Sequence, residues 1–274
     1  MQLYFNVSHF NWSTITFTLF THVISSLSSA FPVRAYQQQA ASWASTPPLL
    51  GLLGWLAQLR GARHFIWEMD LYPDVAVALG VFHRGGLLDR VTGWLADFPR
   101  HRANGIIALG PCMEDRLRRR GIRTTPIFIV HNWADGSALR PLPFRISENL
   151  SVFYSGNMGL AHDFETVLPV LTSLGSSIHF RFSGGGPRRA ELESACAGLA
   201  HCSFTGYHAR QDLEEAFGCN DLGLVTQRAE TVGTVVPSKV YGVLAAGRRC
   251  LFLGPAESEV ARLLREEEGG RVLT

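Results

Sequence analysis

The chain has 274 residues, of which 46% are hydrophobic and 18% charged, with a formal net charge of +2 at pH 7. This balance excludes a disordered protein and leaves ample apolar side chains for the core of one large domain or two ordinary ones. The small net charge and the scattered arginines argue against a nucleic-acid partner.

The first 33 residues contain no Asp, Glu, Lys or Arg. This region lacks the basic start of a signal peptide. Its apolar run at 14–31 is interrupted by Ser, Thr and His22 too often for a membrane span, so we expect a buried or interfacial helix. The five cysteines are odd in number and share no Cys-x-x-Cys spacing, which argues against disulfides and a zinc site and indicates a reducing compartment. The scattered histidines also show no metal-ligand spacing.

From about residue 48 onward, short apolar runs alternate with segments of helical periodicity. In the first half the pattern predicts helix 48–60, strand 62–70, helix 91–98, strand 105–110, a helix ending at Arg119 and strand 126–132. In the second half it predicts strands 151–156, 178–184, 202–206, 221–226 and 249–254, with helices between them. This alternation is typical of parallel sheets with helices on both faces.

Residues 133–150 contain two prolines and little periodicity, which is typical of a linker. We therefore predict an N-terminal Rossmann-like domain over 1–135, a linker over 136–150 and a C-terminal Rossmann-like domain over 151–274. The C-terminal domain is expected to be a doubly wound, five-stranded sheet. In such folds, ligands bind outside the carboxyl ends of the strands.

The run R-L-R-R-R at 116–120 follows the helical pattern of the first half. We interpret it as a solvated helix end, because a helix C-terminus favours cations. Contact with anionic lipid head groups is the alternative interpretation.

Three loops at predicted strand ends in the second half combine the features of an anion site. They are G-N-M-G at 156–159, G-G-G-P at 184–187 and P-S-K at 237–239. Glycines let a backbone approach an anion closely, and a helix N-terminus presents free N–H groups with a partial positive charge. Each loop alone is also ordinary turn chemistry, and neither a P-loop nor a G-x-G-x-x-G fingerprint is present. Together the three loops would suit a diphosphate.

Lys239 is the only lysine of the chain; the other 24 of the 25 Lys and Arg residues are arginine. Ser238 is placed to cap the predicted helix 239–246, and Lys239 adds a full positive charge beside its N-terminus. A cation at that end opposes the helix dipole, so an anionic ligand would explain it. Lysine is a compact point charge suited to a phosphate oxygen.

The segments Y-S-G-N-M-G-L-A-H-D-F-E-T-V-L, F-S-G-G-G-P-R-R-A-E-L and V-P-S-K-V-Y-G-V-L-A-A-G-R closely resemble glycosyltransferase family 4. More narrowly, they resemble the bacterial O-antigen and capsule branch typified by N-acetylfucosamine-type transferases. T-P-P-L-L-G, M-D-L-Y-P-D-V-A-V-A-L-G and V-H-N-W-A-D in the first half agree with the acceptor half of that group. The resemblance covers roughly residues 46–274.

The resemblance implies an α/β fold of the GT-B type, in which two Rossmann-like domains face each other. The C-terminal domain would bind a nucleotide-diphosphate sugar, expected to be a UDP-sugar, without a metal or another cofactor. The N-terminal domain would bind a lipid-linked or saccharide acceptor of bacterial surface polysaccharide synthesis, and transfer would retain the anomeric configuration. The protein would be cytoplasmic, with peripheral contact at the inner face of the cytoplasmic membrane.

The resemblance also assigns roles to individual residues. The donor-binding residues would be Gly156, Asn157, Gly159, Gly184, Gly185, Gly186, Tyr207, His208, Pro237, Ser238 and Lys239. Tyr207 and His208 would lie near the base, and the others near the diphosphate. Asp70, Tyr72 and Asp74 would face the acceptor. The catalytic candidates are Lys239, Glu230 and Asp70.

Some positions depart from the family pattern. Gly242 stands where many members have the second Glu of E-x₇-E, and Val232 stands where an acidic residue usually precedes G-x-x-V-P-S-K. Glu230 is the candidate substitute. Residues 31–45 do not match the strand expected there, and members continue past Thr274, so we expect both domains to be incomplete.

Two other functions stay open at the level of sequence. A UDP-sugar 2-epimerase has the same two-domain fold, and a truncated, inactive glycosyltransferase remnant would bind nucleotide or nothing. A glycoside hydrolase is disfavoured, because it needs two carboxylates flanking the sugar and these loops are rich in glycine instead.

Overall fold

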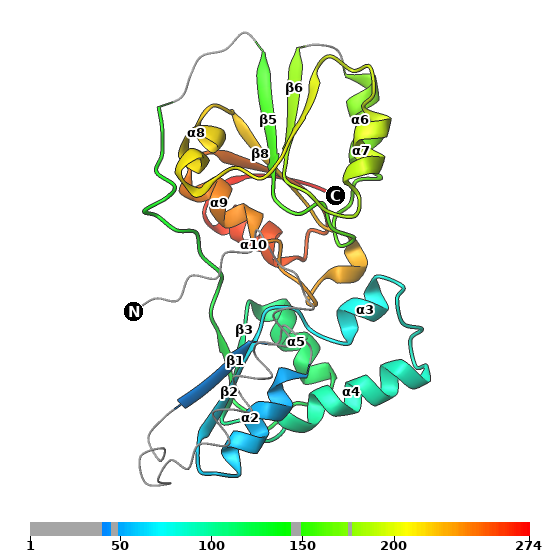
Figure 1. Ribbon diagram of the computed structural model, residues 1–274, viewed down its shortest axis with the longest axis vertical. Helices are drawn as coiled ribbons and strands as arrows, with labels where there is room; N and C mark the ends of the chain where they lie inside the picture. The colour runs from blue at the N-terminus through cyan, green and yellow to red at the C-terminus, as the bar shows by residue number, and fades with distance from the viewer. Residues whose placement is uncertain (1–39, 45–48, 144–148, 175–176) are drawn as a thin grey trace.

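The computed structural model describes residues 40–44, 49–143, 149–174 and 177–274, and it contains two parallel sheets, drawn one above the other in Figure 1. The helix predicted in the first 33 residues lies outside these ranges, as does part of the predicted linker. Along the chain, one sheet precedes residues 130–149 and the other follows them. The described part of this segment contains no helix or strand.

The lower sheet has the strand order β1-β2-β3-β4, and all its pairings are parallel. Its strands are β1 (Ala40–Ala44), β2 (Arg63–Glu68), β3 (Gly105–Ala108) and β4 (Ile127–Ile129). Its helices are α2 (Leu50–Gln58), α3 (Asp74–Ala78), α4 (Leu87–Arg100) and α5 (Pro111–Arg119). The predicted elements of the first half are therefore confirmed, and α4 is longer than expected.

Strand β1 corrects the expectation that residues 31–45 match no strand. Ala40 pairs with Arg63 and Ala44 with Trp67, so β1 extends the sheet beside β2. Its sequence A-A-S-W-A has little intrinsic strand preference. Pairing with the apolar strand β2 decides its conformation, and propensity does not reveal such tertiary pairing.

The upper sheet has six parallel strands in the order β10-β9-β8-β5-β6-β7. They are β5 (Leu150–Ser155), β6 (Ile178–Ser183), β7 (Cys202–Thr205), β8 (Leu222–Thr226), β9 (Arg249–Leu253) and β10 (Gly270–Leu273). Its helices are α6 (Val167–Ser173), α7 (Arg189–Ala195), α8 (Leu213–Gly218), α9 (Lys239–Ala245) and α10 (Glu259–Glu266). The prediction of five strands was wrong by one, because the edge strand β10 and the helix α10 were missed.

The order of the upper sheet places a topological switch point beside β5. The chain runs outward from β5 through β6 to β7, then returns to β8 on the other side of β5. Ligands of doubly wound sheets bind at the carboxyl ends of the strands beside such a point. The loops after β5, β6 and β8 all begin at this edge.

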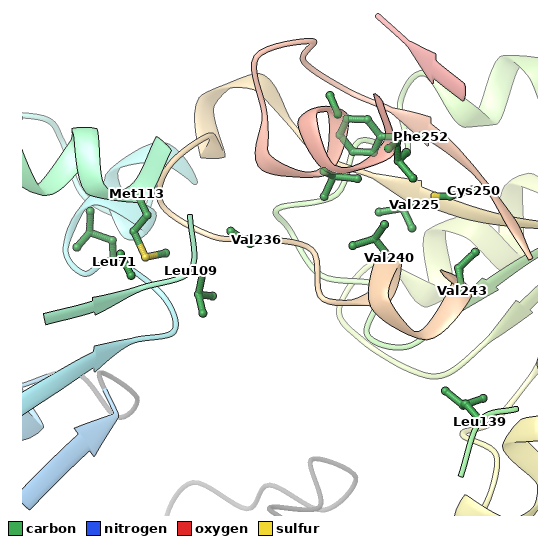
Figure 2. Close-up of a cluster of buried hydrophobic side chains, with 14 of the residues drawn as sticks. Leu71, Leu109, Met113, Leu139, Val225, Val236, Val240, Val243, Cys250 and Phe252 are labelled. Carbon is green, nitrogen blue, oxygen red and sulfur yellow. The ribbon is translucent and has the colours of Figure 1, made fainter. Parts of the chain in front are cut away.

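One apolar core joins the two sheets. It contains Leu71, Leu109 and Met113 of the lower half together with Val236 and Val240 of the upper half, as Figure 2 shows. Hydrogen bonds between main-chain and side-chain groups also cross this boundary. The N–H of Leu71 donates to the carbonyl of Thr234 at 2.8 Å, and the N–H of Cys112 donates to the Glu259 carboxylate.

The arginine run at 116–120 is more than a solvated helix end, which corrects that interpretation. Arg116 pairs with Asp74, Arg118 with Glu114, and Arg120 with both Asp74 and Asp97. Among these arginines only Arg119 is exposed. The run fixes α5 to its neighbours because α3 and α4 present carboxylates to it.

Candidate functional site

Lys239 begins α9, and its side chain crosses the loop that follows β5. A Cβ atom added to Gly156 would lie 3.1 Å from Cε of Lys239. Gly156 also has a φ of +120°, a backbone conformation that residues other than glycine rarely adopt. The stem of the lysine therefore lies directly on the backbone of the G-N-M-G loop.

The first two glycine loops are in backbone contact with each other. The N–H of Met158 donates to the carbonyl of Gly185 at 2.6 Å. A Cβ atom on Gly184 would overlap the carbonyl of Gly156, and one on Gly186 would overlap Asn157. The structure thus brings the predicted residues of G-N-M-G, G-G-G-P and Lys239 together at one edge of the sheet.

His162 is the residue of this site that sequence reasoning missed. Its Nε2 lies 2.8 Å from Nζ of Lys239, and its Nδ1 lies 2.7 Å from the carbonyl oxygen of Thr226 at the end of β8. A carbonyl only accepts, so Nδ1 carries the proton and Nε2 offers its lone pair to the lysine. Burial and the positive charge of Lys239 lower the pKa of His162 to about 3, which keeps the imidazole neutral.

Lys239 is held without a neutralising carboxylate in the part of the chain that the structure describes. Its polar side-chain contact there is with His162, and its Nζ lies 5.3 Å from the centre of the Tyr154 ring. Burial lowers the pKa of Lys239 to about 7, because taking an ammonium group out of water disfavours its charged form. An anion placed here would restore the charge and balance it.

Tyr207 and His208 follow β7 at the same edge. A Cβ atom on Gly185 would lie 3.3 Å from Cε2 of Tyr207, so that ring borders the second glycine loop, and Tyr207 as a whole is 53% exposed. The His208 ring lies 6.2 Å from the ring of Phe153 on β5. Tyr207 is thus close to the second glycine loop, and His208 lies beside β5.

Ser238 does not cap α9, which corrects the predicted cap. It occupies the N-cap position, but its side chain makes no capping hydrogen bond. Its φ of −65° and ψ of −13° are helical, whereas a capping serine has an extended backbone that turns its hydroxyl back to the helix. Its side chain is exposed, while the preceding Pro237 is buried.

Glu230 lies in a short 3-10 turn, Ala229–Thr231, on the surface. Its carboxylate is 3.8 Å from Nε of Arg228. Among the described residues no polar contact joins it to Lys239, so the structure does not bring these two catalytic candidates together. Gly242 lies against the ring of Phe217, where an added Cβ would be in van der Waals contact with Cζ at 3.4 Å.

The acceptor candidates follow β2. The Leu71–Thr234 bond brings their loop beside the loop that leads to Lys239. Burial and the nearby Glu68 raise the pKa of Asp70 to about 6. Tyr72 is half-buried, and its carbonyl accepts from Nη2 of Arg100 at 3.0 Å.

Asp74 is engaged elsewhere. Its two carboxylate oxygens bond to Arg116 and Arg120, so it ties α3 to α5. In the described ranges no three His, Cys, Asp or Glu side chains gather as metal ligands would. No helix of those ranges is long and apolar enough to cross a membrane.

Comparison with known proteins extends this description. No protein-family model matches the chain. Over 224 residues, 76% of its length, it is 24% identical to the putative colanic acid biosynthesis glycosyl transferase WcaI of Escherichia coli K12. Over 229 residues it is 26% identical to the probable glycosyltransferase WbjE of Pseudomonas aeruginosa. The chain spans about half the length of these relatives, 55% and 56% respectively.

Among solved structures the chain is similar to HepE of Anabaena, determined in complex with UDP. The TM-score is 0.68 at 14% identity, over 92% of this chain and 68% of that one. The chain has the GT-B glycosyltransferase fold. The predicted fold class and the predicted resemblance to glycosyltransferases are confirmed.

Proposed function

We propose that this protein transfers a sugar from a UDP-sugar to a lipid-linked or saccharide acceptor in the synthesis of a bacterial surface polysaccharide, with retention of configuration. The observation that carries this proposal is the partly buried Lys239, which has no carboxylate partner among the described residues and lies on Gly156 beside the switch point. HepE, which has the same fold, was solved with UDP and with UDP-glucose. The name of WcaI places that relative in colanic acid synthesis.

In this proposal the departing diphosphate is stabilised by fixed positive charge. As the sugar becomes oxocarbenium-like, negative charge grows on the leaving phosphate oxygen, and a preorganised cation there is commonly a large catalytic contribution. Lys239 supplies that charge, and the glycines at 156, 184 and 186 let the backbone approach the phosphates. The neutral His162 orients the ammonium group without competing for the anion.

Proton transfer needs no protein nucleophile in this scheme. In a front-face retaining route, the leaving phosphate accepts the proton of the attacking acceptor hydroxyl. Asp70, whose pKa of about 6 is raised by burial, is the candidate that orients the acceptor beside the lysine loop.

Tyr207 and His208 are the candidates for contact with the base. A lipid-linked acceptor would bring the protein to the inner face of the cytoplasmic membrane as a peripheral protein.

The test is release of UDP from candidate UDP-sugars by the purified chain, with and without a lipid-linked acceptor fraction. The proposal predicts that UDP appears only when acceptor is present. Conversion of the donor to its 2-epimer without acceptor would identify an epimerase instead. Absence of both reactions, together with no binding of UDP in a titration, would identify an inactive remnant.

A further inference from the structure

Helix α5 of the lower half begins without a cap of its own. Its N-cap position is Gly110, which makes no capping bond because it has no side chain. The first helical residue, Pro111, has no N–H, so Cys112 provides the first main-chain donor of the helix. Helix starts are normally satisfied by a side-chain oxygen of the residue just before them. The start of α5 needs another acceptor.

The upper half supplies that acceptor from α10, which lies above α5 in Figure 1. Oε1 of Glu259, the first residue of α10, accepts from the N–H of Cys112 at 2.5 Å, although the two residues are 147 positions apart. A carboxylate suits this place because a helix N-terminus carries a partial positive charge. The Sγ of Cys112 also donates to the carbonyl of Glu257 at 3.1 Å. One turn of α5 is thus bonded twice to the other half.

The glycine at position 110 is explained by this contact. A Cβ atom on Gly110 would overlap the carboxylate of Glu259. The φ of 174° is extended and open to any residue, so the close approach of the carboxylate, and not the backbone conformation, demands glycine here. Glu259 is itself fixed, since it is 5% exposed and bonds to Nη2 of Arg262 at 2.9 Å. Ser258 before it caps α10 through the N–H of Ala261.

The same turn of α5 also touches the loop that leads to Lys239. A Cβ atom on Gly233 of that loop would lie 2.6 Å from the carbonyl oxygen of Cys112. The N–H of Leu71, next to the acceptor candidates, donates to the following residue of the loop at 2.8 Å. The start of α5 is therefore held between Glu259 and the lysine loop.

We propose that Glu259 is a positioning residue of the transfer reaction. By capping α5 from the upper half, it fixes the acceptor side of the lower half against the loop that carries Lys239. Its hydrogen bonds in the described part of the chain are to Cys112 and Arg262, so it acts through α5 and not on the donor. The inference rests on the proposed function, because positioning matters only for a reaction between the two halves. A displacement of about 1 Å between reacting groups can cost on the order of 10²-fold in rate.

Glu259→Ala tests the proposal, with Glu266→Ala as the matched control. The control removes the other carboxylate of α10 that bonds to Arg262, but it leaves the contact with α5 intact. Transfer is measured as UDP release from a UDP-sugar at saturating lipid-linked acceptor fraction. We expect Glu259→Ala to lose about tenfold or more in kcat and the control to match the wild type. UDP affinity should be equal in all three proteins, because the glycine loops and Lys239 belong to the upper half.

Hydrogen exchange distinguishes a joint between the halves from a local helix cap. The amides of Cys112 and Leu71 should both exchange about tenfold or more faster in Glu259→Ala than in the wild type. Leu71 is informative because its hydrogen bond crosses the same boundary without involving Glu259. Faster exchange at Cys112 alone, together with a wild-type kcat, would overturn the proposal. If the wild type releases no UDP, the proposed function fails, and the exchange rate of Leu71 then decides whether Glu259 fixes the halves.

Gly110→Ala tests the same contact from the lower half. Its Cβ would displace the carboxylate, so we expect a loss in kcat similar to that of Glu259→Ala. Adding Gly110→Ala to Glu259→Ala should cost little more, because the two changes break one contact. Glu259→Gln, which keeps the shape and an acceptor oxygen, should retain most of the activity. Fully additive losses would overturn the proposal. If Glu259→Ala does not fold, a wild-type kcat in Gly110→Ala would overturn it as well.

Discussion

Nζ of Lys239 and Nε2 of His162 lie 2.8 Å apart, although the two residues are 77 positions apart in the chain. The other ring nitrogen of His162 bonds to the end of β8, so one imidazole connects that strand to the only lysine of the protein. A carboxylate in its place would neutralise the lysine. A neutral imidazole positions the ammonium group and leaves its charge available for an anion.

Replacing His162 by Asn should keep its hydrogen bond to Thr226 and remove its hydrogen bond to Lys239. The shorter amide can still donate to the carbonyl of Thr226 but cannot reach Lys239. We expect His162→Asn to weaken UDP binding about tenfold or more, the effect of one hydrogen bond to a charged group, and to lower the melting temperature, because the imidazole is buried against the rings of Tyr154 and Phe164. Calorimetric titration with UDP measures the affinity, and a thermal melt measures the melting temperature. An unchanged affinity would show that the lysine needs no positioning partner.

The pH dependence of UDP binding follows from Lys239. Its pKa is lowered to about 7 in the free protein, and a bound diphosphate should raise it again. Below pH 7 the lysine is already charged in the free protein, so its titration does not change the affinity for UDP there. Above pH 7 binding must take up a proton, so affinity should fall by up to about tenfold per pH unit until the pKa of the complex is reached.

Lys239→Arg is the matched control for that experiment, because arginine stays charged throughout the range. Its UDP affinity should be nearly flat between pH 7 and about pH 9. The same slope in the wild type and in Lys239→Arg would assign the titration to another group.

Gly184→Ala should destabilise the upper half. An alanine Cβ there would overlap the carbonyl of Gly156, and the φ of +124° is unfavourable for alanine. We expect the free energy of unfolding to fall by about 2 kcal/mol or more in urea denaturation. Gly136→Ala is the control, since its Cβ would meet nothing within 4 Å, and its effect should stay within about 0.5 kcal/mol. Equal stability of the two variants would contradict the close loop contact.

Arg100→Leu should destabilise the lower half. The substitution leaves Glu68 as a buried carboxylate without its ion-pair partner, and it also removes the donor to the carbonyl of Tyr72. We expect a loss of about 3–5 kcal/mol in the free energy of unfolding. Arg123→Leu, at an exposed arginine of the same half, should have an effect of less than about 0.5 kcal/mol. A small effect of Arg100→Leu would show that the pair is not needed to hold α4.

The fold was largely predictable because its central strands are continuous apolar runs. In β5 and β8, four of six and four of five residues are buried. The missed elements lack that signal. Strand β10 alternates between half-buried and exposed residues at a sheet edge, and β1 depends on pairing with β2. Such elements are decided by tertiary contacts, which periodicity does not report.

The candidate site was predictable where backbone geometry demands glycine. Gly156, Gly184 and Gly186 all have positive φ, and each lies against another part of the site. The missed His162 stands within a recognised motif, but its role depends on a contact with Lys239 far along the chain. Asp74 was assigned to the acceptor by resemblance alone, and only the structure shows its carboxylate bonded to Arg116 and Arg120.

In the proposed function, Lys239 binds the diphosphate of a nucleotide-sugar. Titration of the wild-type chain and Lys239→Ala with UDP, near pH 7 in a calorimeter, tests it most directly. We predict that the wild type binds UDP and that Lys239→Ala binds it at least about tenfold more weakly, the value of a charge-assisted hydrogen bond. In an active preparation the same variant should lose on the order of 10²-fold in kcat. Equal UDP affinity for the two proteins, or no binding to the wild type, would contradict the claim.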